Sequence, residues 1–341
     1  MKKHSLLSLL TGLVALAAGP LAMAAGEVNL YSHRHYEIDK QLYADFTAAT
    51  GIKVNVVQAS ADQLMERLKS EGENSPADLF MTADAGRLQR AKEAGLLQSV
   101  TSETLAAQVP GTLRDTDKQW YGMTVRSRVI VYSKARVKPS ELSTYADLSD
   151  PKWKGRLLAT SAGSVYNQSL LAAIVGTEGR EAALAWAKGV QGNLARAPQG
   201  GDRDQARAIA AGLADIAIVN TYYIGVLGTS SSPADRQVAE QVAVFFPDQA
   251  GRGAHINVSG AGVTKSAKNR DNAIKLLEFL TSPAVQARFA TANHEYPLTL
   301  AYDASPELKA FGPFKADVDS VRKLGEFNAA AVEIFNTVGW Q

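Results

Sequence analysis

The sequence predicts an α/β protein built from two lobes. Segments with apolar residues two apart alternate with segments whose apolar residues recur at helical spacing, which is typical of a largely parallel sheet covered by helices. A β-rich run over residues 123–132 is longer than its neighbours and suits a crossover between lobes. The chain has 341 residues, a length near the upper limit of a single hydrophobic core. We therefore expect two lobes, each a mainly parallel sheet flanked by helices, joined by hinge crossover strands.

The first 24 residues have the features of a secretory signal peptide. Two lysines precede an apolar stretch over residues 6–18, and small residues close the segment at Ala22 and Ala24. This stretch is shorter than the roughly 20 apolar residues that a membrane-spanning helix needs. We expect cleavage after Ala24, export to an envelope compartment, most simply a periplasm, and no membrane insertion of the mature chain.

The first lobe is expected to begin with three strand and helix pairs. The first strand alternates apolar and polar residues, the second places Ile52, Val54 and Val56 two apart, and the third is a short apolar run. Helical spacing of apolar residues follows each of them. The expected strands cover residues 28–32, 51–57 and 79–81, and the expected helices cover 38–47, 61–70 and 85–94.

The second lobe is expected to follow the crossover run. Its strands are expected over residues 155–159 and 214–219, and its helices over 167–175, 178–190 and 203–212. Two further strands, 242–246 and 255–263, then lead into helices over 269–280 and 284–291, where the chain returns to the first lobe. We place the first lobe at residues 25–122 plus 249–297, and the second at 123–248 plus 298–341.

Charge and cysteine content exclude several classes of function. The sequence has 36 basic and 34 acidic side chains, and removing the two signal-peptide lysines leaves 34 of each. A formally neutral chain has no general attraction to nucleic acid or to an anionic membrane. We expect a monomer that binds no nucleic acid. The chain has no cysteine, so any chemistry must use oxygen and nitrogen groups.

Tyrosines follow three of the predicted strands. Tyr36, next to His35, follows the first strand, Tyr166 lies in a loop rich in serine and glycine, and Tyr222 and Tyr223 follow the strand at 214–219. Ligands in α/β proteins bind beyond the carboxyl ends of strands, and a cleft between lobes can close around them. A single tyrosine is usually a core or rim residue. Two adjacent tyrosines cannot both fill one core, so at least one is expected to face the cleft.

Phenolate chemistry favours ferric iron. A phenol has a pKa near 10 and stays protonated at neutral pH unless a strong Lewis acid replaces the proton, which a trivalent cation can do. Hard, highly charged ions prefer oxygen donors. Calcium favours clustered carboxylates, and zinc would draw on more His or Cys ligands. Four tyrosinates on Fe3+ leave one net negative charge, and Arg126 on the crossover strand is the expected counter-charge.

Two other functions remain open at this point. A binding protein for a small anion or an organic solute would use the tyrosines as hydrogen-bond donors and stacking surfaces. A secreted hydrolase would need a nucleophile and a base, but the sequence has no Gly-x-Ser-x-Gly elbow and no His-Glu-x-x-His helix. We therefore expect a binding protein that catalyses no reaction.

The sequence resembles the periplasmic ferric-iron-binding proteins that serve bacterial ABC importers, of the tyrosine-rich kind. The resemblance spans the mature chain, and it is carried by Tyr31-Ser-His-Arg-His35-Tyr36, Pro76-Ala-Asp-Leu-Phe80, Tyr166 in its loop, Gly200-Gly-Asp-Arg-Asp-Gln-Ala206, Asn220-Thr-Tyr-Tyr223 and Glu295-Tyr-Pro297. It implies the two-lobed, transferrin-like type II solute-binding fold. It also implies capture of Fe3+ between the lobes and delivery to an inner-membrane permease.

The resemblance implies a set of site residues as well. Tyr36, Tyr166, Tyr222 and Tyr223 match the iron ligands of the family. His35 matches a position that coordinates iron in some members and not in others, and Arg126 matches an arginine just outside the ligands. Some relatives carry an arginine shortly after the tyrosine pair, whereas Ile-Gly-Val-Leu follows Tyr223 here. This departure bears on how the charge of the site is balanced, and on whether a synergistic anion such as carbonate joins the iron.

Overall fold

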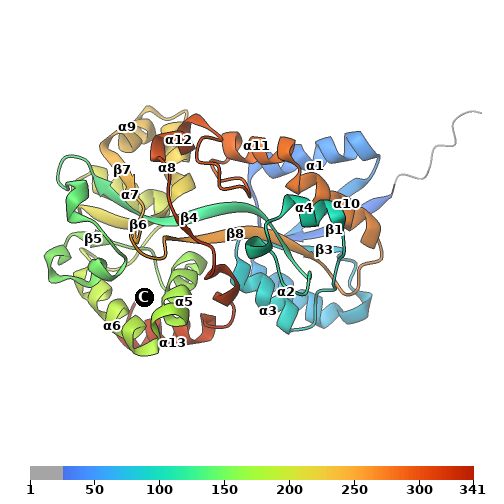
Figure 1. Cartoon of the computed structure of the whole chain (residues 1–341), viewed down its shortest axis with the longest axis horizontal. Coiled ribbons are helices and arrows are strands. Elements are labelled where there is room, and N and C mark those ends of the chain that lie inside the picture. Colours follow the sequence, from blue (N-terminus) through green and yellow to red (C-terminus); the bar gives the residue numbers. More distant parts are fainter. Residues whose placement is uncertain (1–25) are drawn as a thin grey trace, which may run out of the picture.

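The computed structural model describes residues 26–341, so the predicted signal peptide and its cleavage site lie outside the described residues. Figure 1 shows two α/β lobes side by side, joined by two long strands, β4 (Tyr121–Ser133) and β8 (Ala254–Val263). These strands pair antiparallel, with Arg126 opposite Asn257. The predicted α/β class and the crossover strand are therefore confirmed.

The sheet that runs through both lobes is mixed. Its strand order is β2-β1-β3-β8-β4-β6-β5, with β7 added beside β4 and β9 beside β8. Strands β1, β2 and β3 pair parallel, as do β5 and β6, whereas β4 and β8 run antiparallel to their main neighbours. Parallel pairing therefore belongs to each lobe, and the antiparallel pairs lie along the strands that connect the lobes.

The elements of the first lobe agree closely with the expected ones, apart from the helix at residues 103–108, which was not predicted. Its strands are β1 (Glu27–Ser32), β2 (Lys53–Gln58) and β3 (Leu79–Thr82). Its helices are α1 (Glu37–Thr50), α2 (Ala61–Glu71), α3 (Ala85–Glu93), α4 (Glu103–Gln108), α10 (Arg270–Thr281) and α11 (Pro283–Ala292). Local signals set several ends: Ser60 and Gln63 form a capping box before α2, and Gly51 ends α1 in the left-handed conformation at φ 71°.

The rest of the chain forms the remaining elements. The remaining strands are β5 (Leu157–Leu158), β6 (Ile216–Asn220), β7 (Val242–Phe245) and the short β9 (Ala316–Asp317). The remaining helices are α5 (Val165–Glu178), α6 (Arg180–Asn193), α7 (Asp202–Ala210), α8 (Thr221–Gly228), α9 (Pro233–Gln241), α12 (Pro306–Phe311) and α13 (Asn328–Val338). Single 3-10 turns cover Gly72–Asn74, Gly111–Leu113, Pro139–Glu141, Ala146–Ser149, Pro151–Trp153 and Val321–Lys323.

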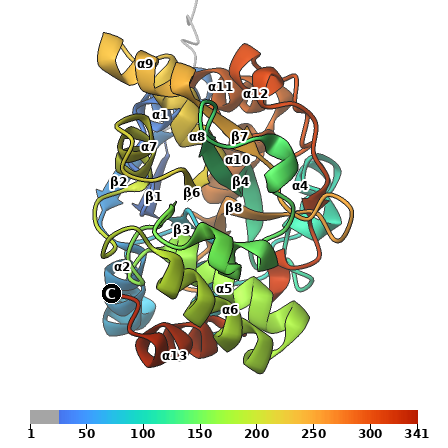
Figure 2. The same cartoon turned by 90° about the vertical axis from the view of Figure 1, so that its left-hand side faces the viewer.

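Buried hydrophobic side chains form two clusters. The larger one surrounds β1, β3 and β8 and includes Phe46 and Phe289. The second lies around α5, α6 and α13 and includes Trp186 and Trp340, whose rings stack with centroids 6.4 Å apart. Figure 2 shows α13 beside α6 at the base of the second lobe. Each large apolar side chain removed from water stabilises the fold by about 1.5–3 kcal/mol. The larger cluster also contains Val219 and Leu227 of the second lobe, so it runs through both lobes, whereas the smaller cluster lies within the second lobe.

No helix within residues 26–341 combines the length and the apolar composition that crossing a membrane requires.

Candidate metal centre

The four tyrosines lie at the N-terminal ends of three helices. Tyr36 has an extended backbone and directly precedes α1, Tyr166 lies in the first turn of α5, and Tyr222 and Tyr223 lie in the first turn of α8. Tyr166 was expected in a loop, which is wrong because α5 begins at Val165, two residues before its predicted start. The tyrosine pair does follow the predicted strand, but it lies in α8, a helix that was not predicted from the sequence. The N-terminal end of a helix carries partial positive charge, which favours an anionic phenolate there.

The side chains of these tyrosines converge from the two lobes. The Tyr222 hydroxyl lies 3.3 Å from the Tyr36 hydroxyl of the first lobe and 3.3 Å from the Tyr166 hydroxyl. The ring of Tyr223 packs on that of Tyr222, with centroids 4.1 Å apart. The fold thus brings together all four tyrosines that the sequence singled out.

Burial keeps these phenols protonated. Burial, and next the neighbouring Tyr166, raises the pKa of Tyr36 and of Tyr222 well above the ordinary value. Burial also raises the pKa of Tyr223. Tyr36, Tyr222 and Tyr223 are therefore neutral at neutral pH, and a buried phenol of this kind loses its proton only to a strong Lewis acid.

A pocket of about 460 Å³ opens beside the tyrosines. Its lining comes from both lobes and includes His35, Tyr36, Arg203, Tyr222, Tyr223 and Asn293. The exposed imidazole of His35 stacks on the Tyr36 ring with centroids 5.4 Å apart, and its Nδ1 lies 3.4 Å from the His33 carbonyl oxygen. His35 therefore lies at the mouth of the pocket, beside the tyrosine cluster. Residues 26–341 hold no group of three His, Asp or Glu side chains suited to a metal ion.

Arg126 is buried and already paired. It is 1% exposed, its guanidinium donates to the Ala83 carbonyl and to Ser259 Oγ, and its Nη2 lies 3.0 Å from Glu295 Oε1. Its Cζ lies 5.9 Å from the centre of the Tyr166 ring. The predicted place beside the tyrosines is therefore correct, but its charge is shared with a carboxylate that the sequence reasoning did not connect to it.

Arg128, two residues along the same strand, has its own partners. Its guanidinium donates to Asp202 Oδ2 and, over 2.6 Å, to Asn167 Oδ1, and its Cζ lies 5.8 Å from the Tyr166 ring centre. Asp202 also accepts the backbone N–H of Asn220, the residue that precedes α8, at 2.8 Å. This ion pair thus links the hinge strand to the start of the helix that carries the tyrosine pair.

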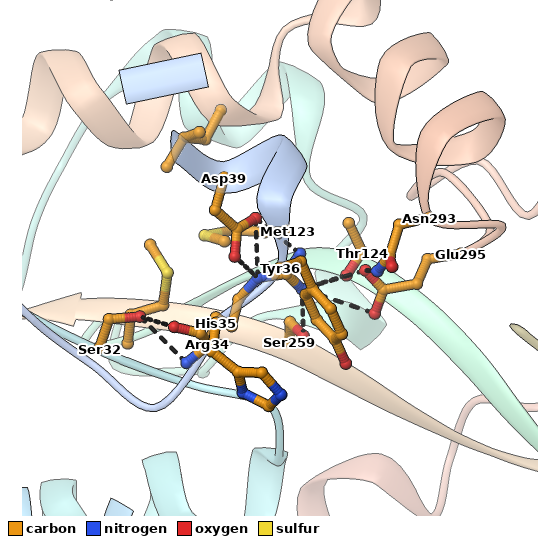
Figure 3. Close-up of polar contacts among 12 residues, drawn as sticks. Ser32, Arg34, His35, Tyr36, Asp39, Met123, Thr124, Ser259, Asn293 and Glu295 are labelled. Carbon is orange, nitrogen blue, oxygen red and sulfur yellow. Dashed lines mark hydrogen bonds and ion pairs between the residues drawn. The ribbon is translucent and has the colours of Figure 1, made fainter. Parts of the chain in front are cut away.

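A third buried arginine lies behind Tyr36. Figure 3 shows Arg34 between the carboxylate of Asp39 and that of Glu295. The Arg34 Nη2 lies 2.9 Å from Asp39 Oδ1, its Nη1 lies 3.1 Å from Glu295 Oε2, and its Cζ lies 4.7 Å from the Tyr36 ring centre. Burial alone would raise the pKa of Glu295, but Arg34 and Arg126 lower it below its ordinary value. Glu295 is therefore ionised at neutral pH.

The sequence analysis missed the charged partners Arg34, Asp39 and Glu295. Arg34 and Glu295 lie inside segments that carry the family resemblance, which was the one signal available for them. Their pairing joins residues 261 positions apart. No periodic pattern reveals such a contact.

The two lobes also touch directly near the site. Ser169 Oγ of α5 donates to Asp84 Oδ2 over 2.5 Å, and Asn257 Nδ2 of the hinge strand β8 donates to the same oxygen over 2.7 Å. Two lobes joined by long strands, with converging side chains from both lobes beside a pocket, define a two-lobed ligand-binding protein of the type II class.

Comparison with known proteins places the chain within that class. Residues 41–316 match the model of the bacterial extracellular solute-binding proteins, and the chain belongs to this family, in the group that contains the ferric iron-binding proteins. It is 52% identical to iron uptake protein A1 of Synechocystis over 325 residues, which cover 94% of this chain and 90% of the relative.

Solved structures agree with this placement. A Trichodesmium protein in complex with iron and citrate ligands superposes with a TM-score of 0.88 at 50% identity, covering 93% of this chain and all of that one (100%). The ferric binding protein of Campylobacter jejuni gives a TM-score of 0.88 at 45% identity, covering 92% of this chain and 100% of that one.

Proposed function

We propose that this chain captures Fe3+ between its lobes through the phenolates of Tyr36, Tyr166, Tyr222 and Tyr223, and delivers the ion to the permease of an ABC transporter. The observation that carries the proposal is the Tyr222 hydroxyl, which lies 3.3 Å from the hydroxyls of both Tyr36 and Tyr166. The names of the relatives, iron uptake protein and ferric binding protein, support iron as the cargo. The chain itself catalyses no reaction.

Binding exchanges protons for the ion. Four phenols that each release one proton place four negative charges around Fe3+, so the bound unit carries a net charge of −1. The N-terminal ends of α1, α5 and α8 face this charge with their partial positive ends. Acidification reverses the exchange, and reduction to Fe2+ weakens it because phenolate holds the less charged ion poorly.

The pocket beside the tyrosines leaves room for a further ligand. His35 is one candidate, and a small anion such as carbonate is the other, with Arg203 on the pocket wall to attract it. The Trichodesmium relative holds citrate together with iron, which supports the second choice.

The proposal also covers the lobe boundaries, the start of the mature chain, its compartment and its oligomeric state. We place the lobes at residues 25–122 plus 249–297 and at 123–248 plus 298–341. The mature protein begins after Ala24, acts in the periplasm and works as a monomer. Amino-terminal sequencing of the exported protein tests the cleavage site, and light scattering tests the monomer.

The iron proposal is tested by absorption spectroscopy with metal analysis of the purified protein. Tyrosinate-to-iron charge transfer colours the loaded protein orange to red, with one iron per chain. A loaded protein without this colour contradicts tyrosine ligation. Calorimetry that shows tight binding of a small anion or an organic solute, and none of ferric citrate, would instead favour a carrier of that anion or solute.

A further inference from the structure

The buried side chains behind Tyr36 carry no net charge before iron arrives. Two arginines, Arg34 and Arg126, and two carboxylates, Asp39 and Glu295, are all at most 3% exposed. Asp39 pairs with Arg34, and Glu295 pairs with both arginines, at 3.1 Å and 3.0 Å. Two positive charges thus meet two negative charges. The nearby pair of Arg128 and Asp202 is balanced in the same way.

Because of this balance, the buried arginines behind Tyr36 supply no net counter-charge to the bound iron. The tetra-tyrosinate complex brings one negative charge into a buried site, and such a charge is costly unless a positive group offsets it. The arginines nearest the tyrosines supply positive charge, but carboxylates already cancel it. A site built only for tight binding would leave one of these arginines unpaired.

Glu295 is the carboxylate that both arginines share. Backbone bonds of 2.8 Å and 2.9 Å pair Tyr296 with Val125, which sets Glu295 beside the hinge strand next to Arg126. Asn293 Nδ2 donates to Glu295 Oε2 over 2.7 Å and holds the carboxylate in place. Figure 3 shows the Glu295 carboxylate and the Tyr36 ring on the same side of Arg34.

We propose that Glu295 limits how tightly the site holds Fe3+, by cancelling the arginine charge that would otherwise offset the negative tetra-tyrosinate complex. This inference rests on the proposed function. A carrier has to release its cargo to a permease, and a buried carboxylate beside the ligands weakens the hold without removing a ligand. Glu295 acts through the arginines and does not contact the metal.

The decisive variant is Glu295→Gln, which removes the charge and keeps the size of the side chain. Its iron affinity, measured by competition with a chelator, is expected to rise by about tenfold to a hundredfold, since one charge several ångströms away in protein contributes that much at an effective dielectric constant near 20. Release to the chelator slows by a similar factor. Glu295→Asp keeps the charge and is expected to bind no tighter than wild type. A purely structural role for Glu295 predicts weaker iron binding in both variants.

A second pair of variants avoids leaving a buried arginine unpaired. Arg126→Gln leaves excess negative charge and is expected to weaken iron binding, whereas Arg126→Gln combined with Glu295→Gln restores neutrality and binds iron at least about tenfold tighter than Arg126→Gln alone. This comparison still tests the role of Glu295 if the Glu295→Gln variant alone does not fold.

The outcomes separate this inference from the proposed function. Wild-type protein that shows no charge-transfer band with ferric citrate overturns the iron proposal, and the inference with it. If wild-type protein binds iron but Glu295→Gln or the double variant binds it no tighter than its parent, the role of Glu295 is overturned and the iron proposal stands. Tighter binding in both comparisons supports it.

Discussion

The hydroxyl oxygens of Tyr36 and Tyr222 lie 3.3 Å apart, although 186 positions separate the two residues in the chain. Tyr36 belongs to the first lobe and Tyr222 to the second, so this contact exists only while the lobes are close together. An ion that binds both phenolates, as we propose, would tie the two lobes to each other and so couple metal capture to lobe closure.

Replacing the central phenol tests the ligand set. Tyr222→Phe removes one hydroxyl from a ring that stays buried, so the fold is expected to remain while iron affinity falls by at least about a hundredfold, since even outer partners of a metal ligand are worth 10- to 100-fold. The charge-transfer band should also shift. Tyr43→Phe is the matched control, because Tyr43 is buried in α1 and its hydroxyl donates to Met81 Sδ over 3.5 Å and not to one of the four clustered tyrosines. Equal affinities for both variants contradict the assignment of Tyr222.

Iron binding is expected to strengthen as the pH rises. The pKa values of Tyr36, Tyr222 and Tyr223 are raised by burial in the metal-free protein, so these phenols carry protons there and lose them when iron binds. Lower pH favours the protonated, metal-free state, and higher pH favours the loaded state. Chelator competition between about pH 5 and pH 8 should give an affinity that rises by several powers of ten per pH unit, approaching one power for each released proton. An affinity independent of pH would mean that the ligands are not phenols.

The close contact between α8 and His294 can be tested by substituting two glycines of α8. A Cβ at Gly225 would lie 2.6 Å from Cγ of His294, whose own backbone is in the left-handed region at φ 53°. Gly225→Ala is expected to lower the free energy of unfolding by about 1–3 kcal/mol and to weaken iron binding, because the helix that carries Tyr222 and Tyr223 must shift.

Gly228→Ala is the control for that variant. A Cβ there meets its nearest neighbour, Cβ of Ala239, at an ordinary 3.7 Å. The substitution is expected to change the free energy of unfolding by less than about 1 kcal/mol and to leave iron affinity unchanged. Urea unfolding and chelator competition measure both effects, and a similar loss in the two variants would show that packing against His294 is unimportant.

The buried pair of Arg128 and Asp202 is expected to be expensive to break. Asp202→Asn keeps the size of the side chain but leaves Arg128, which is 1% exposed, without its counter-charge, so the free energy of unfolding should fall by about 3–5 kcal/mol. Glu333→Gln breaks the exposed pair with Arg180 and should cost no more than about 1 kcal/mol. Chemical denaturation of the metal-free proteins gives both values, and equal losses would show that burial does not set the cost.

Local patterns were enough to predict most of the strands, the longer helices that follow them and the residues of the tyrosine cluster. Apolar periodicity gave those elements to within a few residues, but it missed the helices α4, α8, α9, α12 and α13 and the short strand β9. At the site, α5 begins two residues before its predicted start, and Tyr222 and Tyr223 lie in the first turn of the unpredicted α8. The first turn of a helix has no periodic partner upstream, so apolar spacing does not reveal it.

The sequence by itself determined the donor chemistry that we propose for this protein. With no cysteine and few histidines, only hard oxygen donors remained, and the tyrosines beyond the ends of strands were the ones that converged. Only the tertiary structure decided the charge around them. Glu295 meets Arg34 and Arg126 across 261 and 169 positions of chain, because backbone pairing of residues 125 and 296 brings these segments together. Coulomb energy depends on distance in space, so the balance of buried charge is settled by the packing of distant segments.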